Sequence, residues 1–251
     1  MNKIATLRNS RGGNVPDVIA VCRDLISFGA EGITIHPRPD GRHIRVNDVY
    51  QISKLLKKIN QARSKASKIE FNIEGYPNAE FFKFLKDTRP DQATLVPDPP
   101  DVLTSNAGWK LAENENKLRS VLRKVHGFGV RSSIFVDVFK FNTAEERALA
   151  RLKPNRIELY TERYAQDYDS SARERKNSAT AYARVATIAE NLGIEVNAGH
   201  DLTSENVGYL LKETPQILEC SIGHALVAEA LYLGFKKTIE KYKKAMRSAR
   251  V

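Results

Sequence analysis

The stretch SFGAEGITI (residues 27–35) joins a helical pattern to a short β-rich run through two glycines. A glycine just past the last periodic residue is typical of a helix C-terminus, and the β-branched run after it is typical of a buried strand. The same junction recurs in HGFGVRSSI (126–134) and NLGIEVN (191–197). These junctions predict helix-to-strand connections of βα units and not β-hairpins.

β-rich and amphipathic runs alternate along the whole chain, and up to eight such units can be counted. The expected strands are a curtailed first one ending near Lys3, then 32–36, 69–74, 93–97, 132–138, 156–161, 194–200 and 218–223. The expected helices are 16–28, 47–65, 78–88, 115–128, 144–152, 178–192, 204–212 and 226–246. No linker-like segment divides the chain. Eight units in 251 residues predict a single-domain α/β fold, a (β/α)8 TIM barrel over 1–251 with a shortened first strand.

The charge balance favours an anionic partner. Lys and Arg number 40 against 30 Asp and Glu, a net charge of +10, which suits nucleic acid, an anionic membrane or phosphorylated small molecules. Much of the excess lies in 53–68 and 236–250, where cations alternate with apolar positions as on a solvated helix face. Because the chain also lacks a zinc-finger pattern and an aromatic RNP-type strand, we expect no nucleic-acid partner.

The hydrophobic pattern indicates neither a membrane span nor a secretory signal. No apolar run reaches the roughly 18 to 20 residues that a spanning helix needs, and the N-terminal sequence MNKIATLRNSRGG has no apolar signal-peptide core. We therefore expect no membrane partner and a cytoplasmic location. Cys22 and Cys220 lie in apolar segments without CxxC spacing, which favours buried free thiols over a disulfide or a metal site.

Ionisable residues gather where the predicted strands end. His36 ends the second strand, Glu74 the third and His200 the seventh, while His43 and His224 lie just beyond strand ends. Four of the five histidines are placed in this way. The carboxyl ends of barrel strands surround one cavity, so a carboxylate and two imidazoles there could exchange protons near neutral pH. A lone histidine would more often be a structural residue, and the repetition favours a catalytic cluster.

Two groups of residues near the same strand ends suit phosphate. Arg38, Arg42 and His43 crowd the loop after the second strand, and Arg8 and Arg11 crowd the loop after the first. The glycines of NAGHD and SIGHA end the last two strands, where barrels commonly bind phosphate at a helix N-terminus. Two separate cationic or glycine-rich sites predict either one substrate with two phosphates or two substrates with one each.

A catalytic metal is the main alternative for the histidines and carboxylates. His, Glu and Asp at strand ends can bind zinc. The chain has no HxH or HExxH pair, and a proline-bearing loop separates His36 from His43. We therefore expect no metal site.

Seven motifs in order resemble one known family. IATLRNSRGG, GITIHPRPDGRHIR, FNIEGYP, TLVPD followed by TSNAGW, RIELYTERYA, VNAGHDLT and SIGHAL are similar to the motifs of the pyridoxine 5′-phosphate synthase family, across nearly the whole chain. The resemblance implies a cytoplasmic (β/α)8 barrel that forms a homo-oligomer, such as an octamer or another even assembly. It also implies condensation of 3-amino-2-oxopropyl phosphate with 1-deoxy-D-xylulose 5-phosphate to pyridoxine 5′-phosphate, phosphate and water.

The resemblance assigns roles to individual residues. His36 and Glu74 would accept protons, and His200 would donate one. The remaining residues would bind substrate: Arg38, His43, Thr104, Asn2 and Lys3 the deoxyxylulose phosphate, and Arg11, the Asp201 backbone, Gly223 and His224 the aminoketone phosphate. No cofactor is implied, because nothing is oxidised overall. Residues 161–177 form a polar segment that is a candidate lid.

The chain departs from the family pattern at its start. Many relatives have Asp-His where this chain has Asn2-Lys3. A lysine keeps a positive charge near a phosphate but does not exchange protons at neutral pH as histidine does. Relatives also usually carry further residues before IATLRN, including an asparagine that contacts the aminoketone, and that contact is not expected here.

Two other functions remain open at this point. A phosphosugar aldolase or epimerase would need a strand-end Schiff-base lysine or a metal set, and only Lys3 approaches that requirement. A non-catalytic basic barrel that binds phosphate or nucleic acid is the second alternative. The retention of His36, Glu74 and His200 argues against it.

Overall fold

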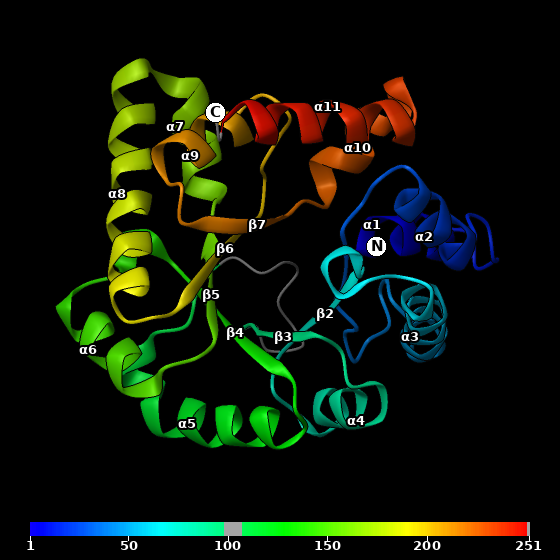
Figure 1. The fold of residues 1–251 in the computed structure, drawn as a ribbon, viewed down its shortest axis with the longest axis horizontal. Helices are drawn as coiled ribbons and strands as arrows, with labels where there is room; N and C mark the ends of the chain where they lie inside the picture. Colours follow the sequence, from blue (N-terminus) through cyan, green and yellow to red (C-terminus); the bar gives the residue numbers. More distant parts are fainter. Residues whose placement is uncertain (98–106, 250–251) are drawn as a thin grey trace.

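The computed structural model describes residues 1–97 and 107–249 and has a parallel sheet curled into a barrel (Figure 1). Its strands are β1 (Gly32–Ile35), β2 (Glu70–Gly75), β3 (Gln92–Leu95), β4 (Arg131–Val136), β5 (Arg156–Tyr160), β6 (Glu195–Gly199) and β7 (Ile217–Ser221), paired in chain order. The α-helices are α1 (Asn2–Asn9), α2 (Val18–Ser27), α3 (Val46–Gln61), α4 (Ala79–Thr88), α5 (Leu111–Gly127), α6 (Thr143–Leu152), α7 (Glu162–Ser170), α8 (Ala172–Asn191), α9 (Val207–Glu213), α10 (His224–Leu233) and α11 (Phe235–Ser248). The predicted α/β barrel of the TIM type is confirmed.

The segment expected to hold a shortened first strand is a helix instead. The buried residues of α1 are Ile4, Ala5 and Arg8, and their spacing is that of one helix face. Among the described residues, β1 and β7 therefore each pair with a strand on one side only. Their side chains still meet across the seam, where the hydroxyl oxygens of Thr34 and Ser221 lie 3.5 Å apart.

Helical patterns near the C-terminus are divided differently from the prediction. The single helix expected over 226–246 is two helices, α10 and α11, separated at Gly234. Gly234 has φ +75°, a left-handed conformation that glycine adopts without a steric penalty. The candidate lid at 161–177 is also helical, since it comprises α7 and the first turns of α8, with the Ser171 hydroxyl capping α8.

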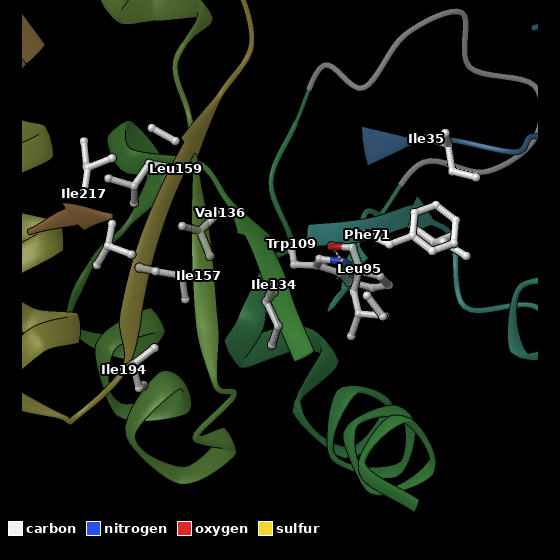
Figure 2. Packing of buried hydrophobic residues seen from close by; sticks show 14 of the residues in the cluster. Ile35, Phe71, Leu95, Trp109, Ile134, Val136, Ile157, Leu159, Ile194 and Ile217 are labelled. Atoms are coloured by element: carbon white, nitrogen blue, oxygen red, sulfur yellow. Dashed lines mark hydrogen bonds between the residues drawn. The ribbon is translucent and has the colours of Figure 1, made fainter. Parts of the chain in front are cut away.

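The apolar core lies between the barrel strands and the helices. Figure 2 shows side chains such as Ile134, Ile157 and Leu159 in this layer, with the Trp109 indole N–H donating to the Leu95 carbonyl at 3.0 Å. Alternate strand positions carry polar groups that meet inside the barrel. Arg156 of β5, for example, pairs with Glu219 of β7 at 2.8 Å across one intervening strand. The interior of the barrel is therefore polar.

Candidate active site

His36 and Glu74 form a buried pair at the carboxyl ends of two adjacent strands. Parallel pairing sets Ile35 of β1 opposite Ile73 of β2, so the residues that follow them are neighbours. The Nδ1 atom of His36 lies 3.8 Å from a carboxylate oxygen of Glu74. The two residues are only 7% and 8% exposed. An imidazole and a carboxylate therefore lie together at this end of the barrel.

The surroundings of His36 keep its imidazole neutral. Burial lowers the pKa of His36 well below 6.5, and the positive charge of Arg38 lowers it further. Arg38 is itself buried in the loop after β1. A neutral imidazole has a free lone pair, so His36 can accept a proton at neutral pH.

His43 and Lys3 lie beside this pair. The rings of His36 and His43 have centroids 5.9 Å apart. Burial and the charges of Arg38 and Arg42 lower the pKa of His43 to about 4. The ammonium of Lys3 lowers the pKa of both His43 and His200, which places it near both rings. A cationic cluster around neutral imidazoles suits an anionic group such as a phosphate.

His200 follows β6 and completes the cluster. The two imidazoles lie close enough that a positive charge on His200 lowers the pKa of His36. The His200 ring packs against Phe135 of β4 and Tyr160 of β5, with centroids at 5.0 and 5.2 Å. Burial lowers the pKa of His200, and Asp201 opposes the shift. The structure thus brings together the three residues that the sequence predicts as catalytic.

Glu158 is a further ionisable group that the predicted set did not include. It lies on β5, is 1% exposed, and neither carboxyl oxygen has a hydrogen-bond partner among the described residues. Burial and the nearby charge of Glu74 raise the pKa of Glu158 well above 4.5, which favours a neutral carboxylic acid. The sequence places Glu158 near the end of its expected strand, 156–161, but assigns it no role there.

Gly199 leaves space for the Glu158 carboxyl group. A Cβ atom at Gly199 would lie 2.3 Å from a carboxyl oxygen of Glu158. Gly199 pairs with Tyr160, two residues after Glu158, in the β5–β6 ladder. The VNAGH motif therefore needs a glycine at this position for steric reasons, in addition to any contact with a substrate.

The other predicted binding residues are more scattered. Asn2 lies at the cluster, since its side-chain oxygen accepts from the His36 backbone N–H at 2.9 Å. Asp201, Gly223 and His224 are exposed at the ends of β6 and β7, and Arg11 is exposed in the turn after α1. Thr104 lies outside the described residues.

Arg8, which the sequence placed in a cationic group with Arg11, has a structural partner. Its guanidinium contacts both carboxylate oxygens of Asp48 at 2.7 and 2.8 Å and donates to the His43 carbonyl oxygen. Arg8 and Asp48 are both buried. This ion pair therefore holds the loop that contains His43 against helix α3.

The described residues contain neither a metal-binding cluster nor a membrane-spanning helix. Within 1–97 and 107–249, no group of three or more His, Cys, Asp or Glu side chains is arranged to hold a metal ion. Over the same residues, every helix is too short or too polar to cross a bilayer.

Comparison with known proteins decides the family. The sequence pattern of the family described as pyridoxal phosphate biosynthesis protein PdxJ matches residues 1–248. The chain belongs to this family. It is 47% identical to pyridoxine 5′-phosphate synthase of Porphyromonas gingivalis over 97% of this chain and 95% of that one. It is 46% identical to the Bacteroides fragilis protein of the same name, over 98% and 97% of the two chains.

Solved structures support the fold of this PdxJ family member. Thiamine phosphate pyrophosphorylase from Pyrococcus furiosus matches with a TM-score of 0.56 at 12% identity, covering 94% of this chain and 92% of that one. Phosphoribosyl anthranilate isomerase from Thermococcus kodakaraensis matches with a TM-score of 0.53 at 13% identity, covering 90% and 93%. At these identities the likeness concerns the barrel fold alone.

Proposed function

We propose that this chain is a pyridoxine 5′-phosphate synthase that condenses 3-amino-2-oxopropyl phosphate with 1-deoxy-D-xylulose 5-phosphate. The observation that carries the proposal is the His36–Glu74 pair, 3.8 Å apart and buried beside His200, in a member of the PdxJ family. The products are pyridoxine 5′-phosphate, one phosphate and water.

Imine formation, phosphate elimination, water addition and ring closure all move protons between carbon, nitrogen and oxygen atoms. Glu74 and the neutral imidazole of His36 are the proposed bases, and they contact the same region of the pocket. Two adjacent acceptors allow successive protons to be removed without releasing the intermediate. The overall reaction is redox-neutral, so these steps call for no redox cofactor.

His200 is the proposed proton donor. Because burial lowers its pKa in the free protein, the imidazole must gain a proton before it can give one up. A bound phosphate dianion favours the imidazolium, so substrate binding raises the pKa of His200. Glu158, which burial keeps neutral, is a second group able to hold a proton inside the pocket.

The two phosphates are assigned to two sides of the pocket. Arg38 and His43, with Asn2, Lys3 and Thr104, are proposed to bind the deoxyxylulose phosphate. The pKa effects of Arg38 and Lys3 on His43 support this assignment, because they indicate a shared cationic region. Arg11, the Asp201 backbone, Gly223 and His224 are proposed to bind the aminoketone phosphate at the start of α10, where backbone N–H groups are available to an anion.

A homo-oligomer of even order, such as an octamer, in the cytoplasm is part of the same proposal. Leu231 and Tyr232 of α10 are 76% and 91% exposed. Leu7 of α1 is also exposed, and α1 contacts α10. Large exposed apolar side chains favour coverage by another protein surface, and a second copy of this chain satisfies that requirement. Sedimentation equilibrium of the purified chain tests it, and a monomer at micromolar concentration would contradict it.

The activity is tested by mixing the purified chain with both phosphorylated substrates. We expect pyridoxine 5′-phosphate, detected by absorbance and mass, and we expect none when either substrate is omitted. Absence of product from a folded chain with both substrates would contradict the proposal.

A further inference from the structure

The backbone at His200 has an unusual conformation. His200 has φ +84° and the next residue, Asp201, has φ +55°. Residues with a Cβ atom rarely adopt positive φ, and two consecutive ones need specific support from their surroundings. This turn sets the direction in which the His200 side chain leaves the end of β6.

Thr161 supplies hydrogen bonds to this turn from the adjacent strand end. It directly follows β5 and is 0% exposed. Its backbone N–H donates to the Gly199 carbonyl at 2.9 Å, and its hydroxyl is 2.7 Å from the same oxygen. The hydroxyl also contacts the carbonyl oxygen of His200. One side chain therefore contacts the two carbonyl groups that flank the start of the turn.

Thr161 lies at the N-terminus of a helix, but its hydroxyl does not cap that helix. Thr161 is the N-cap residue of α7, where a threonine side chain usually accepts a hydrogen bond from its own helix. In the part of the chain that the structure describes, this hydroxyl makes no such bond to α7. It is directed instead to β6, so its bonds serve the turn at His200.

Two aromatic rings contact the His200 imidazole once the turn has placed it. Phe135 lies at 5.0 Å in a tilted arrangement and Tyr160 at 5.2 Å edge-on, measured between ring centroids. Tyr160 is the residue before Thr161, so the same strand end contacts both the ring and the backbone of His200. A change in the turn would move the imidazole relative to these rings.

We propose that Thr161 is a positioning residue for His200: its hydroxyl holds the positive-φ turn that aims the imidazole into the pocket. The inference rests on the proposed proton-donor role of His200. Thr161 acts through the backbone, with its hydroxyl contacts directed to carbonyl oxygens of Gly199 and His200. Loss of the hydroxyl leaves the His200 carbonyl without this donor and allows the turn to relax.

The test compares Thr161→Val, which removes the hydroxyl at nearly constant shape, with Thr161→Ser, which retains it. We expect Thr161→Val to lower kcat by about 10- to 100-fold with KM changed much less, since a misplacement of the order of 1 Å can have such an effect. Thr161→Ser should keep most of the turnover of the unmodified chain. Thr161→Ala provides a second hydroxyl-free variant if the valine form does not fold.

Thr88→Val is the matched control. Thr88 is also buried, and its hydroxyl donates to the Phe84 carbonyl at 2.7 Å in α4. This variant removes the same kind of hydrogen bond away from the site. We expect it to alter stability and to leave kcat unchanged.

A spectroscopic measurement separates positioning from general structural damage. The ring-proton NMR signals of His200, assigned by comparison with His200→Asn, should carry ring-current shifts from Phe135 and Tyr160. We expect Thr161→Val to reduce those shifts and to return the pKa of His200 toward 6.5, from its lowered value in the unmodified chain. Thr161→Ser should leave both unchanged.

The outcomes distinguish this inference from the proposed function. An unmodified chain that makes no product contradicts the function, while the NMR comparison still tests the position of His200. A folded Thr161→Val form with unchanged turnover and unchanged His200 signals would overturn the inference. Equal losses of kcat in Thr161→Ser and Thr161→Val would overturn it as well, because the hydroxyl would then not be the group that positions His200.

Discussion

The imidazole of His36 and the carboxylate of Glu74 meet at 3.8 Å because β1 and β2 pair in parallel with Ile35 opposite Ile73. The sheet register thus creates the pair, and burial of both residues removes competing water. In such a site the imidazole and the carboxylate interact more strongly than at the surface. The proposed role of this pair therefore depends on the pairing of β1 with β2.

Replacement of Glu74 by glutamine tests the carboxylate as a base. The amide keeps the shape and removes the proton acceptor, so we expect kcat to fall by about 100-fold or more with substrate binding nearly unchanged. Steady-state kinetics and substrate titration measure the two effects. Glu113→Gln, on the exposed surface of α5, is the control and should keep full activity. Near-normal turnover of Glu74→Gln would refute the assignment.

The lowered pKa of His36 predicts the acidic limb of the pH profile. The base form is present at neutral pH and is lost only as the pH falls through this lowered pKa. The midpoint of the acidic limb of kcat/KM should therefore lie below pH 6.5, since kcat/KM reports groups of the free enzyme. NMR titration of His36 without substrate, assigned with His36→Asn, checks the same group. A His36 midpoint at or above 6.5 would contradict the account.

Glu219 predicts how stability changes with pH. Burial and the nearby Glu70 raise its pKa from 4.5 to about 7, although Arg156 lies 2.8 Å away. A raised pKa means that the folded chain binds this proton more tightly than the unfolded chain. The contribution of Glu219 to folding is therefore most favourable below about pH 4.5 and decreases as the pH rises through about 7.

Urea unfolding of the unmodified chain and of Glu219→Gln at pH 5 and pH 8 measures this effect. Between these pH values the unmodified chain should lose, relative to the variant, unfolding free energy on the order of 3 kcal/mol. Identical pH dependences for the two proteins would show that the Glu219 carboxyl group does not titrate in this range.

A methyl group at Gly199 should disturb the site from within. The Cβ atom of Gly199→Ala would lie 2.3 Å from a Glu158 carboxyl oxygen, so the carboxyl group must move. We expect turnover to fall by at least about 10-fold, as for other small misplacements in active sites. Gly127→Ala in α5 is the control, because its Cβ would meet nothing within 4 Å. If both variants retain full activity, Glu158 has no positional role.

The gathering of His36, Glu74 and His200 at one end of the barrel could be predicted because it depends on periodicity. A strand that ends in His36, Glu74 or His200 places that residue at the carboxyl end of the barrel, whichever strand carries it. The fold class and the convergence of these three residues could therefore be inferred before any coordinates were known. Lys3 and His43 also lie close enough for the Lys3 ammonium to lower the pKa of His43.

Other features depend on contacts that the local sequence does not encode. The run from Asn2 to Asn9 has apolar residues compatible with a strand or a helix, and its packing against the rest of the barrel selects the helix. The importance of Glu158 follows from its burial beside Glu74, which a strand pattern alone does not reveal. The positive φ of His200 depends on Thr161, which lies 39 residues away in the chain.

The central claim is tested most directly by the ratio of two products in a single assay. The purified chain is supplied with both phosphorylated substrates, and inorganic phosphate and pyridoxine 5′-phosphate are measured over time. The account predicts one phosphate for each pyridoxine 5′-phosphate, and loss of both products in His200→Asn. Phosphate release without ring formation would contradict the account. So would His200→Asn and Glu74→Gln forms that both make the two products in the same ratio and at an undiminished rate.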